Sequence, residues 1–316
     1  MVPPETLPSA VSAGDTPVDL PSLERSLRRP RSLFSFAMST FTTLATLAAL
    51  LPLLSVLIML IEKGAAPLSM AALSQLPPSA MMEGGGFGNA IIGTLVIVGI
   101  ASIISVPVGI LAAVYIAEFD PDSRLSDAVR FAAKVLTGLP SILAGVFAFA
   151  VVVAATGHFS APAGGVALSL LMIPTVLLTS EEAIKRVPPR MREAAIGMGA
   201  TPTQVVSKVV LPTAFSGILT GVMLAIARAA GETAPLLFTA LFSDYWMSRT
   251  YPYFLPKTLG DLMKPTASLA VLIYNFSGSP FDNQIAMAWS AALVLVAIVL
   301  VANLVGQTIA RRSTLP

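Results

Sequence analysis

The sequence has no cysteine and a single histidine, His158, among its 316 residues. Disulfide bonds and thiolate metal sites are therefore excluded, and so is any site that needs two histidines. Charge is scarce as well, because only 11% of the residues are Asp, Glu, Lys or Arg, against about 25% in an ordinary soluble domain. Apolar residues make up 55% of the chain. This composition excludes a soluble globular enzyme and a disordered chain.

The sequence does contain apolar, charge-poor runs long enough to cross a membrane, for which about 20 residues are needed. These runs cover residues 32–61, 89–117, 135–156, 163–180, 213–242 and 283–310. A turn-rich stretch between Thr156 and Gly165 separates the third run from the fourth. The sequence therefore predicts an all-α integral membrane protein with six transmembrane helices.

Residues 1–31 have no apolar run and are rich in proline, serine and charge, which predicts a disordered cytoplasmic tail. Most of the 19 lysines and arginines fall in this tail, in the loops after the second and fourth runs, and near the C-terminus. Because basic residues gather on the cytoplasmic side of membrane proteins, both termini are expected inside the cell.

The loop between the fourth and fifth runs, residues 181–212, carries a spaced motif. Its members are Glu193-Ala194-Ala195, Gly199, Val209 and Leu211-Pro212. Pro188 and Pro189 suit the first turn of a helix, and Gly199 suits a left-handed cap at its end. The loop is thus expected to form a short helix outside the membrane, then a turn, then a helix that re-enters.

This motif resembles the EAA loop of ABC importer permeases, with Val209 where that pattern has isoleucine. The resemblance implies the type I importer (MetI-like) bundle. It also implies that the short helix docks on a separate cytoplasmic ATPase, through Glu193, Ala194, Ala195 and Gly199. The sequence has no G-x-x-x-x-G-K-[ST] phosphate loop. We therefore expect neither ATP hydrolysis nor another enzymatic activity from this chain, and no cofactor.

Further matches lie across residues 89–305. They comprise residues 89–95, 138–142, 181–183, 217–221 and 228–237. Together they resemble phosphate importer permeases of the PstA type, although Ala270 stands where that pattern leads us to expect proline. The resemblance implies an ABC permease core at 89–305, preceded by a first transmembrane helix at 32–61, in the inner membrane of a bacterium.

Two charged residues, Arg228 and Glu232, interrupt the fifth apolar run. A charge at the bilayer centre costs about 2.5–3.5 kcal/mol, so both are expected to face the bundle interior, on one face of a helix. In one interpretation they neutralise each other as a structural pair. In the other, Arg228 binds a crossing oxyanion while Glu232 holds Arg228 and accepts a proton from a phosphate hydroxyl. Thr233 is assigned to the same substrate pathway.

We therefore expect a permease subunit of an ATP-driven inorganic phosphate importer, which forms the pathway with a second, PstC-like permease chain. The other expected partners are an ATPase homodimer, an extracytoplasmic phosphate-binding protein and membrane lipid, but no nucleic acid. The alternative within this class is a permease for another oxyanion such as sulfate or molybdate. Alternatives from other classes are an intramembrane enzyme and a channel without an energy source.

Overall fold

The computed structural model describes residues 30–79, 81–82, 84–248 and 256–312, and every regular element within these ranges is helical. The chain divides into two units, Met1–Val56 and Leu57–Pro316. The expected disordered tail lies outside the described residues, except for its last two residues, which belong to the first helix, α1 (Pro30–Ala65).

Within the first unit, the described chain is the part of α1 that runs to Val56. From residue 32 to Val56 it contains no charged residue. The hydroxyls of Thr42, Thr43 and Thr46 each donate to the carbonyl four residues earlier, at 2.8 Å. This stretch of helix therefore satisfies these side-chain donors internally, which suits it to hydrocarbon surroundings.

Within the described ranges, five helical stretches are long and apolar enough to cross a membrane. They are Leu33–Ala65, Gly88–Phe119, Ala161–Lys185, Pro202–Ala230 and Asp282–Arg311. The first stretch is α1, and the second consists of α3 (Gly88–Val114) and the π-helical turn η1 (Tyr115–Phe119). The third is α7 (Ala161–Lys185), and the fourth consists of α9 (Pro202–Val205), the π-helical turn η3 (Val206–Val210) and α10 (Leu211–Ala230). The fifth is α14 (Asp282–Arg312). A bent pair of helices, counted as one span, brings the number of candidate crossings to six, which agrees with the predicted number.

The third crossing is the bent pair, and here the prediction of a single helix over 135–156 is wrong. Helix α4 (Arg124–Gly138) and the stretch that begins with α5 (Ser141–Ala148) and ends at Thr156 meet at 104°. Leu139 is extended, with φ −72° and ψ 140°. A residue before proline is disfavoured in the helical region, and Pro140 therefore forces the break.

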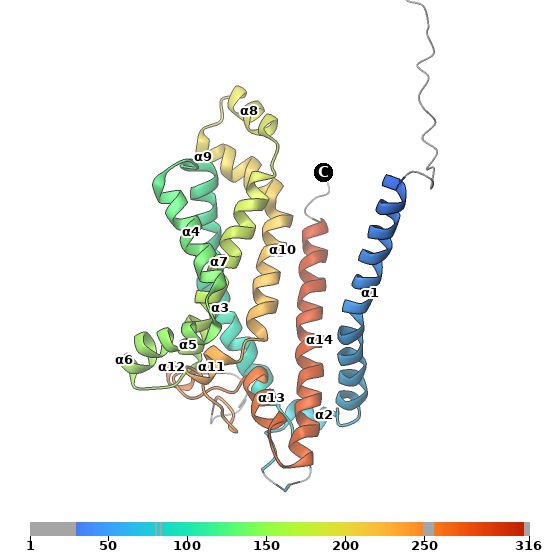
Figure 1. The fold of residues 1–316 in the computed structure, drawn as a ribbon. Coiled ribbons are helices and arrows are strands. Elements are labelled where there is room, and N and C mark those ends of the chain that lie inside the picture. The colour runs from blue at the N-terminus through green and yellow to red at the C-terminus, as the bar shows by residue number, and fades with distance from the viewer. Residues whose placement is uncertain (1–29, 80, 83, 249–255, 313–316) are drawn as a thin grey trace, which may run out of the picture. The chain divides into compact units, whose positions relative to one another are not determined.

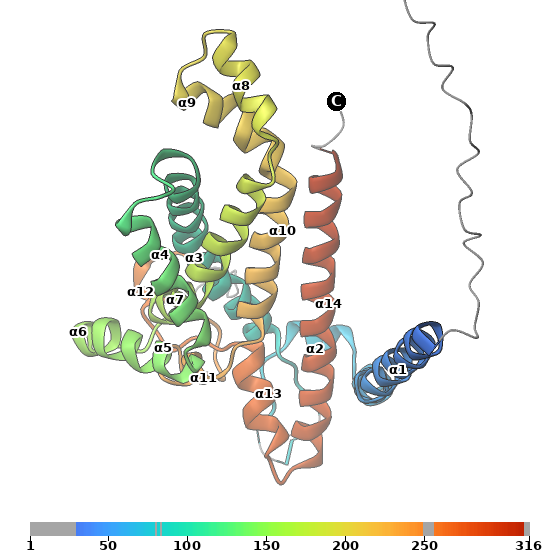
Figure 2. The same ribbon diagram turned by 45° about the horizontal axis from the view of Figure 1, so that its top comes forward.

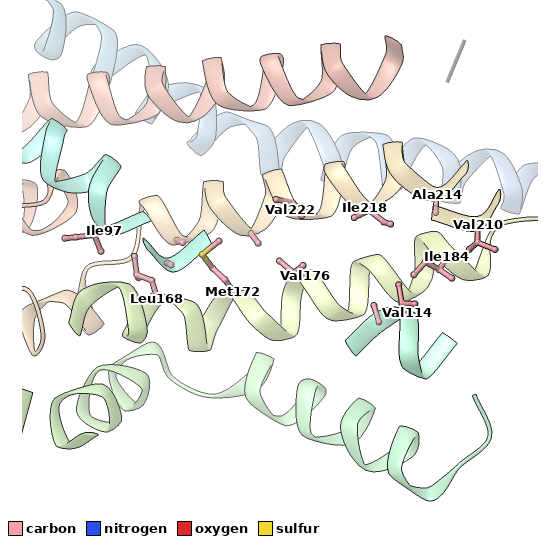
Figure 3. Close-up of a cluster of buried hydrophobic side chains, with 14 of the residues drawn as sticks. Ile97, Val114, Leu168, Met172, Val176, Ile184, Val210, Ala214, Ile218 and Val222 are labelled. Atoms are coloured by element: carbon pink, nitrogen blue, oxygen red, sulfur yellow. The ribbon is translucent and has the colours of Figure 1, made fainter. Parts of the chain in front are cut away.

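Helix α7 lies at the centre of the second unit and contacts α3, α4, α5 and α10, while α14 packs against α10 and against α13 (Leu269–Ser277) (Figures 1 and 2). Ser160 caps the start of α7 by accepting a hydrogen bond from the N–H of Ala163. The main apolar core lies between α3, α7 and α10, with Ile97, Met172 and Ile218 as examples (Figure 3).

Glycines let α7 approach its two neighbours closely. A Cβ on Gly109 of α3 would lie 2.8 Å from Val176 of α7, and a Cβ on Gly221 of α10 would overlap Thr179. Without glycine at these positions the helices would have to separate, because real Cβ contacts are not this short. Small residues thus allow the close helix packing at these contacts.

One end of the second unit carries α9, the short helix α8 (Pro189–Gly197) and the C-terminal end of α14 (Figure 1). The opposite end carries α5, α13 and the short helix α11 (Ala234–Leu237). The basic residues of the two loops expected in the cytoplasm lie at the α8 end. We therefore call the α8 end of the bundle inner and the other end outer.

A segment between α12 (Leu259–Leu262) and α13 inserts from the outer end against α3. The N–H of Leu269 donates to the Oγ1 of Thr94 at 2.8 Å, and both residues are buried. The carbonyl of Ala267 approaches Gly93 so closely that a Cβ there would overlap it. The insertion therefore depends on the missing side chain at Gly93.

We predict that Gly93→Ala destabilises the folded chain by about 1–3 kcal/mol, because the new methyl group must displace the backbone of the inserted segment. Gly99→Ala on the same helix is the control, since no atom lies within 4 Å of a Cβ placed there. Thermal unfolding in detergent measures both variants. Equal melting temperatures for Gly93→Ala and Gly99→Ala would contradict the close approach.

Candidate substrate pathway and coupling helix

Arg228 lies in the last turn of α10, and Glu232 lies beyond the end of that helix. The N–H groups of Gly231 and Glu232 bond to the carbonyls of Arg228 and Ala229, at 3.1 and 3.2 Å, and close the helix. The expectation that the two charges share one helix face is therefore wrong. Pro235 has no N–H, and its ring would collide with the carbonyl of Gly231 in a continued helix.

After the break, the chain resumes as α11, and Pro235 is used in packing. It is buried, and a Cβ on Gly145 of α5 would lie 2.7 Å from its Cα. The proline that ends α10 thus also fixes α11 against the bent third crossing. The interruption of the fifth crossing is therefore held by tertiary contact.

The ion pair between Arg228 and Glu232 is long. The Nε of Arg228 lies 3.5 Å from the Oε1 of Glu232, and the two side chains are 46% and 17% exposed. Within the described part of the chain, neither Nη atom of Arg228 has a hydrogen-bond partner. The forked end of the guanidinium is therefore open, while Glu232 touches only its Nε.

Thr233 follows directly and brings a third segment to this place. Its Oγ1 lies 3.5 Å from the carbonyl of Ala270 in α13, at the limit of a hydrogen bond. Ala270 is the position at which the sequence departs from the family pattern. The structure thus brings Arg228, Glu232 and Thr233 together with α13, and the sequence carried no signal for that last neighbour.

A groove of about 420 Å³ runs between α7 and α10 toward the inner end. Its lining consists mainly of small and hydroxyl-bearing residues, with Leu224 at the end nearest Arg228; the residues are Thr179, Glu182, Ala183, Arg186, Val187, Thr213, Ala214, Ser216, Gly217, Thr220, Gly221 and Leu224. Leu224 and Arg228 are four residues apart on one helix and so share a face. Arg228 thus lies one turn beyond the last α10 residue that lines the groove, on the same face of that helix.

The motif of the inner loop forms the helix and turn that the sequence predicts. Helix α8 begins at Pro189, and Gly199 adopts the left-handed conformation with φ +87°. Glu193, Ala194 and Gly199 are exposed, whereas Ala195 is buried at 3% exposure. Three of the four residues assigned to ATPase coupling are thus accessible, and the fourth holds α8 against the bundle.

Two partly buried ion pairs at the inner end were not predicted. Arg130 bonds to Glu181, and Arg192 bonds to Glu118, each at 2.7 Å. The partners are 51 and 74 residues apart in the sequence. No local sequence pattern joins residues at such separations, so these pairs could not be predicted from the sequence.

At the outer end, Asp261 is held by its own loop. Its carboxylate bonds to the Nζ of Lys264 and to the N–H of Lys257, each at 3.1 Å. These contacts lower the pKa of Asp261 to about 2. The carboxylate therefore keeps its charge under all ordinary conditions and serves to order the loop between α11 and α13.

Six crossings, an interrupted fifth helix with an open arginine, and a short helix at the inner end define a membrane-embedded permease. A family model described as "Binding-protein-dependent transport system inner membrane component" matches residues 105–314. The chain belongs to this family. It is 39% identical over 249 residues to "Phosphate transport system permease protein PstA" of Yersinia pestis, an alignment that spans 79% of this chain and 80% of that one.

Solved structures show the same fold. A chain of the bacterial alginate ABC transporter matches 90% of this chain and 96% of its own length, with a TM-score of 0.60 at 17% identity. A chain of the MetNI methionine ABC transporter matches 73% and 95%, with a TM-score of 0.53 at 22% identity. The predicted MetI-like bundle is therefore confirmed.

We predict that Gly199→Ala weakens the turn after α8, because a left-handed alanine costs about 1–2 kcal/mol. Binding of the ATPase should fall by a factor of roughly 5 to 30. Gly197→Ala is the matched control, since Gly197 is helical and a Cβ there meets nothing within 4 Å. Co-purification of the ATPase at graded concentrations measures the effect. Equal binding by the two variants would contradict a role for the turn.

Proposed function

We propose that phosphate crosses the membrane beside Arg228, on a path that this chain forms with a second, homologous permease chain. The chain is a permease subunit of an ATP-driven phosphate importer, a multi-pass protein of the inner membrane, and not an enzyme. It works with a separate ATPase and with a substrate-binding protein. The proposed path rests on one observation: the guanidinium of Arg228, the one charged residue of α10 (Leu211–Ala230), is open and has only Glu232 as a close partner.

The exposure of Arg228 supports a position on the path. A guanidinium that faced lipid at this depth would be unfavourable by several kcal/mol, yet nearly half of this side chain is exposed. A water-filled path, or a second chain across it, removes that cost. The free Nη atoms supply two parallel donors, which match the spacing of two oxygens on one phosphate.

Glu232 supports phosphate over other oxyanions. Its carboxylate steadies the Nε of Arg228 at 3.5 Å and remains partly exposed. At neutral pH phosphate still carries an O–H group that can donate to this carboxylate, whereas sulfate and molybdate carry only acceptors and would be repelled. Thr233 completes the set, because its hydroxyl is held only weakly by Ala270 and can turn toward an anion.

The groove between α7 and α10 is open on one side, and this supports the presence of a second permease chain. A transport path must be closed toward lipid, and a second chain would cover the open side. That second chain is PstC-like in this proposal. Two permease chains present two coupling helices, and an ATPase homodimer provides one docking groove for each. In this proposal, residues 181–212 form the coupling loop of the 89–305 core, and residues 32–61 form the first transmembrane helix.

We predict that Arg228→Ala lowers ATP-dependent phosphate uptake at least about 100-fold, because a charge-assisted, bidentate contact at the path is lost. Leu224→Ala, one turn away on the same face, should keep uptake within a factor of two or three. Uptake of labelled phosphate by the reconstituted transporter measures both. Co-purified ATPase must stay at the wild-type level in both variants. Wild-type flux in Arg228→Ala would contradict the assignment.

We predict that Glu232→Gln admits sulfate as a competitor, since the neutral amide no longer repels an anion without a hydroxyl donor. The sulfate concentration that halves phosphate uptake should fall by about tenfold or more. Asp122→Asn is the control, because it removes an exposed carboxylate in the turn before α4, outside the groove. If sulfate competes equally with the wild type and with Glu232→Gln, this carboxylate does not select phosphate.

A further inference from the structure

We infer that Arg192 is a positioning residue that fastens the coupling helix α8 to the transmembrane helices, with Glu118 as its partner. The inference rests on the proposed docking of α8 on the ATPase. In this inference, the pair passes the movement of α8, when the ATPase moves it, on to α3 and α7. Without the pair, α8 would still meet the ATPase but would move independently of the path.

Arg192 makes four hydrogen bonds that join three parts of the chain. Its Nη2 and Nε bond to the two carboxylate oxygens of Glu118, at 2.7 and 3.2 Å. Its Nη1 bonds to the carbonyl of Val187 at 2.6 Å, and its Nη2 also bonds to the carbonyl of Ile184 at 3.0 Å. A single guanidinium thereby links α8, the inner end of α7 and the turn η1 at the inner end of α3.

The pair is sheltered from solvent, which distinguishes it from an ordinary surface ion pair. The side chains of Glu118 and Arg192 are 9% and 22% exposed. The pair of Glu182 and Arg186 nearby has a similar distance, 2.6 Å, but its side chains are 66% and 76% exposed. Exposed pairs contribute little rigidity, whereas a sheltered bidentate pair fixes the position of both partners.

Helix α8 has little else to hold it. Among the described residues, Ala195 is the only one in α8 that is buried. Arg192 and Ala195 are three residues apart and therefore share the face that looks toward the bundle. A single alanine methyl offers little apolar area, so the position of α8 depends mainly on the hydrogen bonds of Arg192.

The turn η1 that carries Glu118 is itself fixed from the other side. Its wider π-helical geometry directs the N–H of Asp120 to the carbonyl of Tyr115 and leaves the carbonyl of Ile116 for another donor. That donor is the Nη2 of Arg130, at 2.8 Å, and the Nε of Arg130 pairs with Glu181 of α7. A force on Glu118 therefore reaches α3, α4 and α7 together.

From α7 the contacts continue to the proposed path. Thr179 lies against Gly221 of α10 with no room for a side chain between them, and Arg228 lies two turns further along the same helix. A displacement of α8 can thus reach the path through packed contacts, because closely packed helices move as units. The pair of Arg192 and Glu118 is the first connection in this series.

The test compares Glu118→Gln and Arg192→Lys in the complete transporter, reconstituted with its ATPase and binding protein. Both variants keep side-chain size while removing the bidentate charged contact. The expected result is wild-type assembly, ATP hydrolysis within about twofold of wild type, and phosphate uptake per ATP reduced by roughly 2- to 30-fold. Arg124→Gln, which removes an exposed arginine at the start of α4, should leave this ratio unchanged.

The double variant separates coupling from two unrelated defects. If the two residues act as one contact, Glu118→Gln with Arg192→Lys lowers uptake per ATP no further than the worse single variant. Additive losses, an unchanged ratio in both single variants, or failure of both variants to assemble would each overturn the inference. The last outcome would indicate a purely structural role.

A second measurement reads the position of α8 directly. Because this chain has no cysteine, Met198→Cys at the C-cap of α8 and Leu125→Cys on α4 provide the only two label sites within it, and both side chains are exposed. The partner chains are prepared without accessible cysteines. Glu118→Gln should broaden the distance distribution between the labels in the assembled transporter, and an unchanged distribution would overturn the inference. Failure of the proposed function is recognised separately, as absence of phosphate uptake by the wild-type transporter.

Discussion

The close approach of α7 to its neighbours is the constraint on which the rest of the second unit depends. Val176 meets Gly109 of α3, and Thr179 meets Gly221 of α10, at separations that no side chain on either glycine would allow. Helices in a bilayer gain little from hydrophobic burial against one another, so such contacts supply much of the packing. They also place the inner ends of three helices where one arginine can reach several of them.

Charge is distributed in this protein according to the surroundings that each group meets. At the inner end, Glu118 and Glu181 are sheltered, and each is matched with an arginine at 2.7 Å. In the fifth crossing, Arg228 is matched only loosely, at 3.5 Å, and its fork is open. Tight pairs fix helices, because a sheltered charge without a partner is costly. A loose pair leaves one charge available to a ligand.

Local features of the sequence predicted most of the architecture. The apolar runs gave the six crossings, Pro189 and Gly199 gave the start of α8 and the turn after it, and the basic loops indicated the inner end. Tertiary consequences of local breaks were missed: Pro140 bends the third crossing, and Pro235 both ends α10 and packs on Gly145. Partners such as Arg192 and Glu118 were beyond sequence reasoning, because only folding brings residues 74 positions apart together.

The most direct measurement is an electron cryo-microscopy structure of the assembled transporter, with the ATPase, the binding protein and phosphate, trapped during transport. The account predicts density for phosphate within hydrogen-bond distance of the Nη atoms of Arg228, between this chain and the second permease chain. Phosphate bound elsewhere, with the fork of Arg228 fully engaged by carboxylates of the partner chain, would contradict it and would make Arg228 a structural residue.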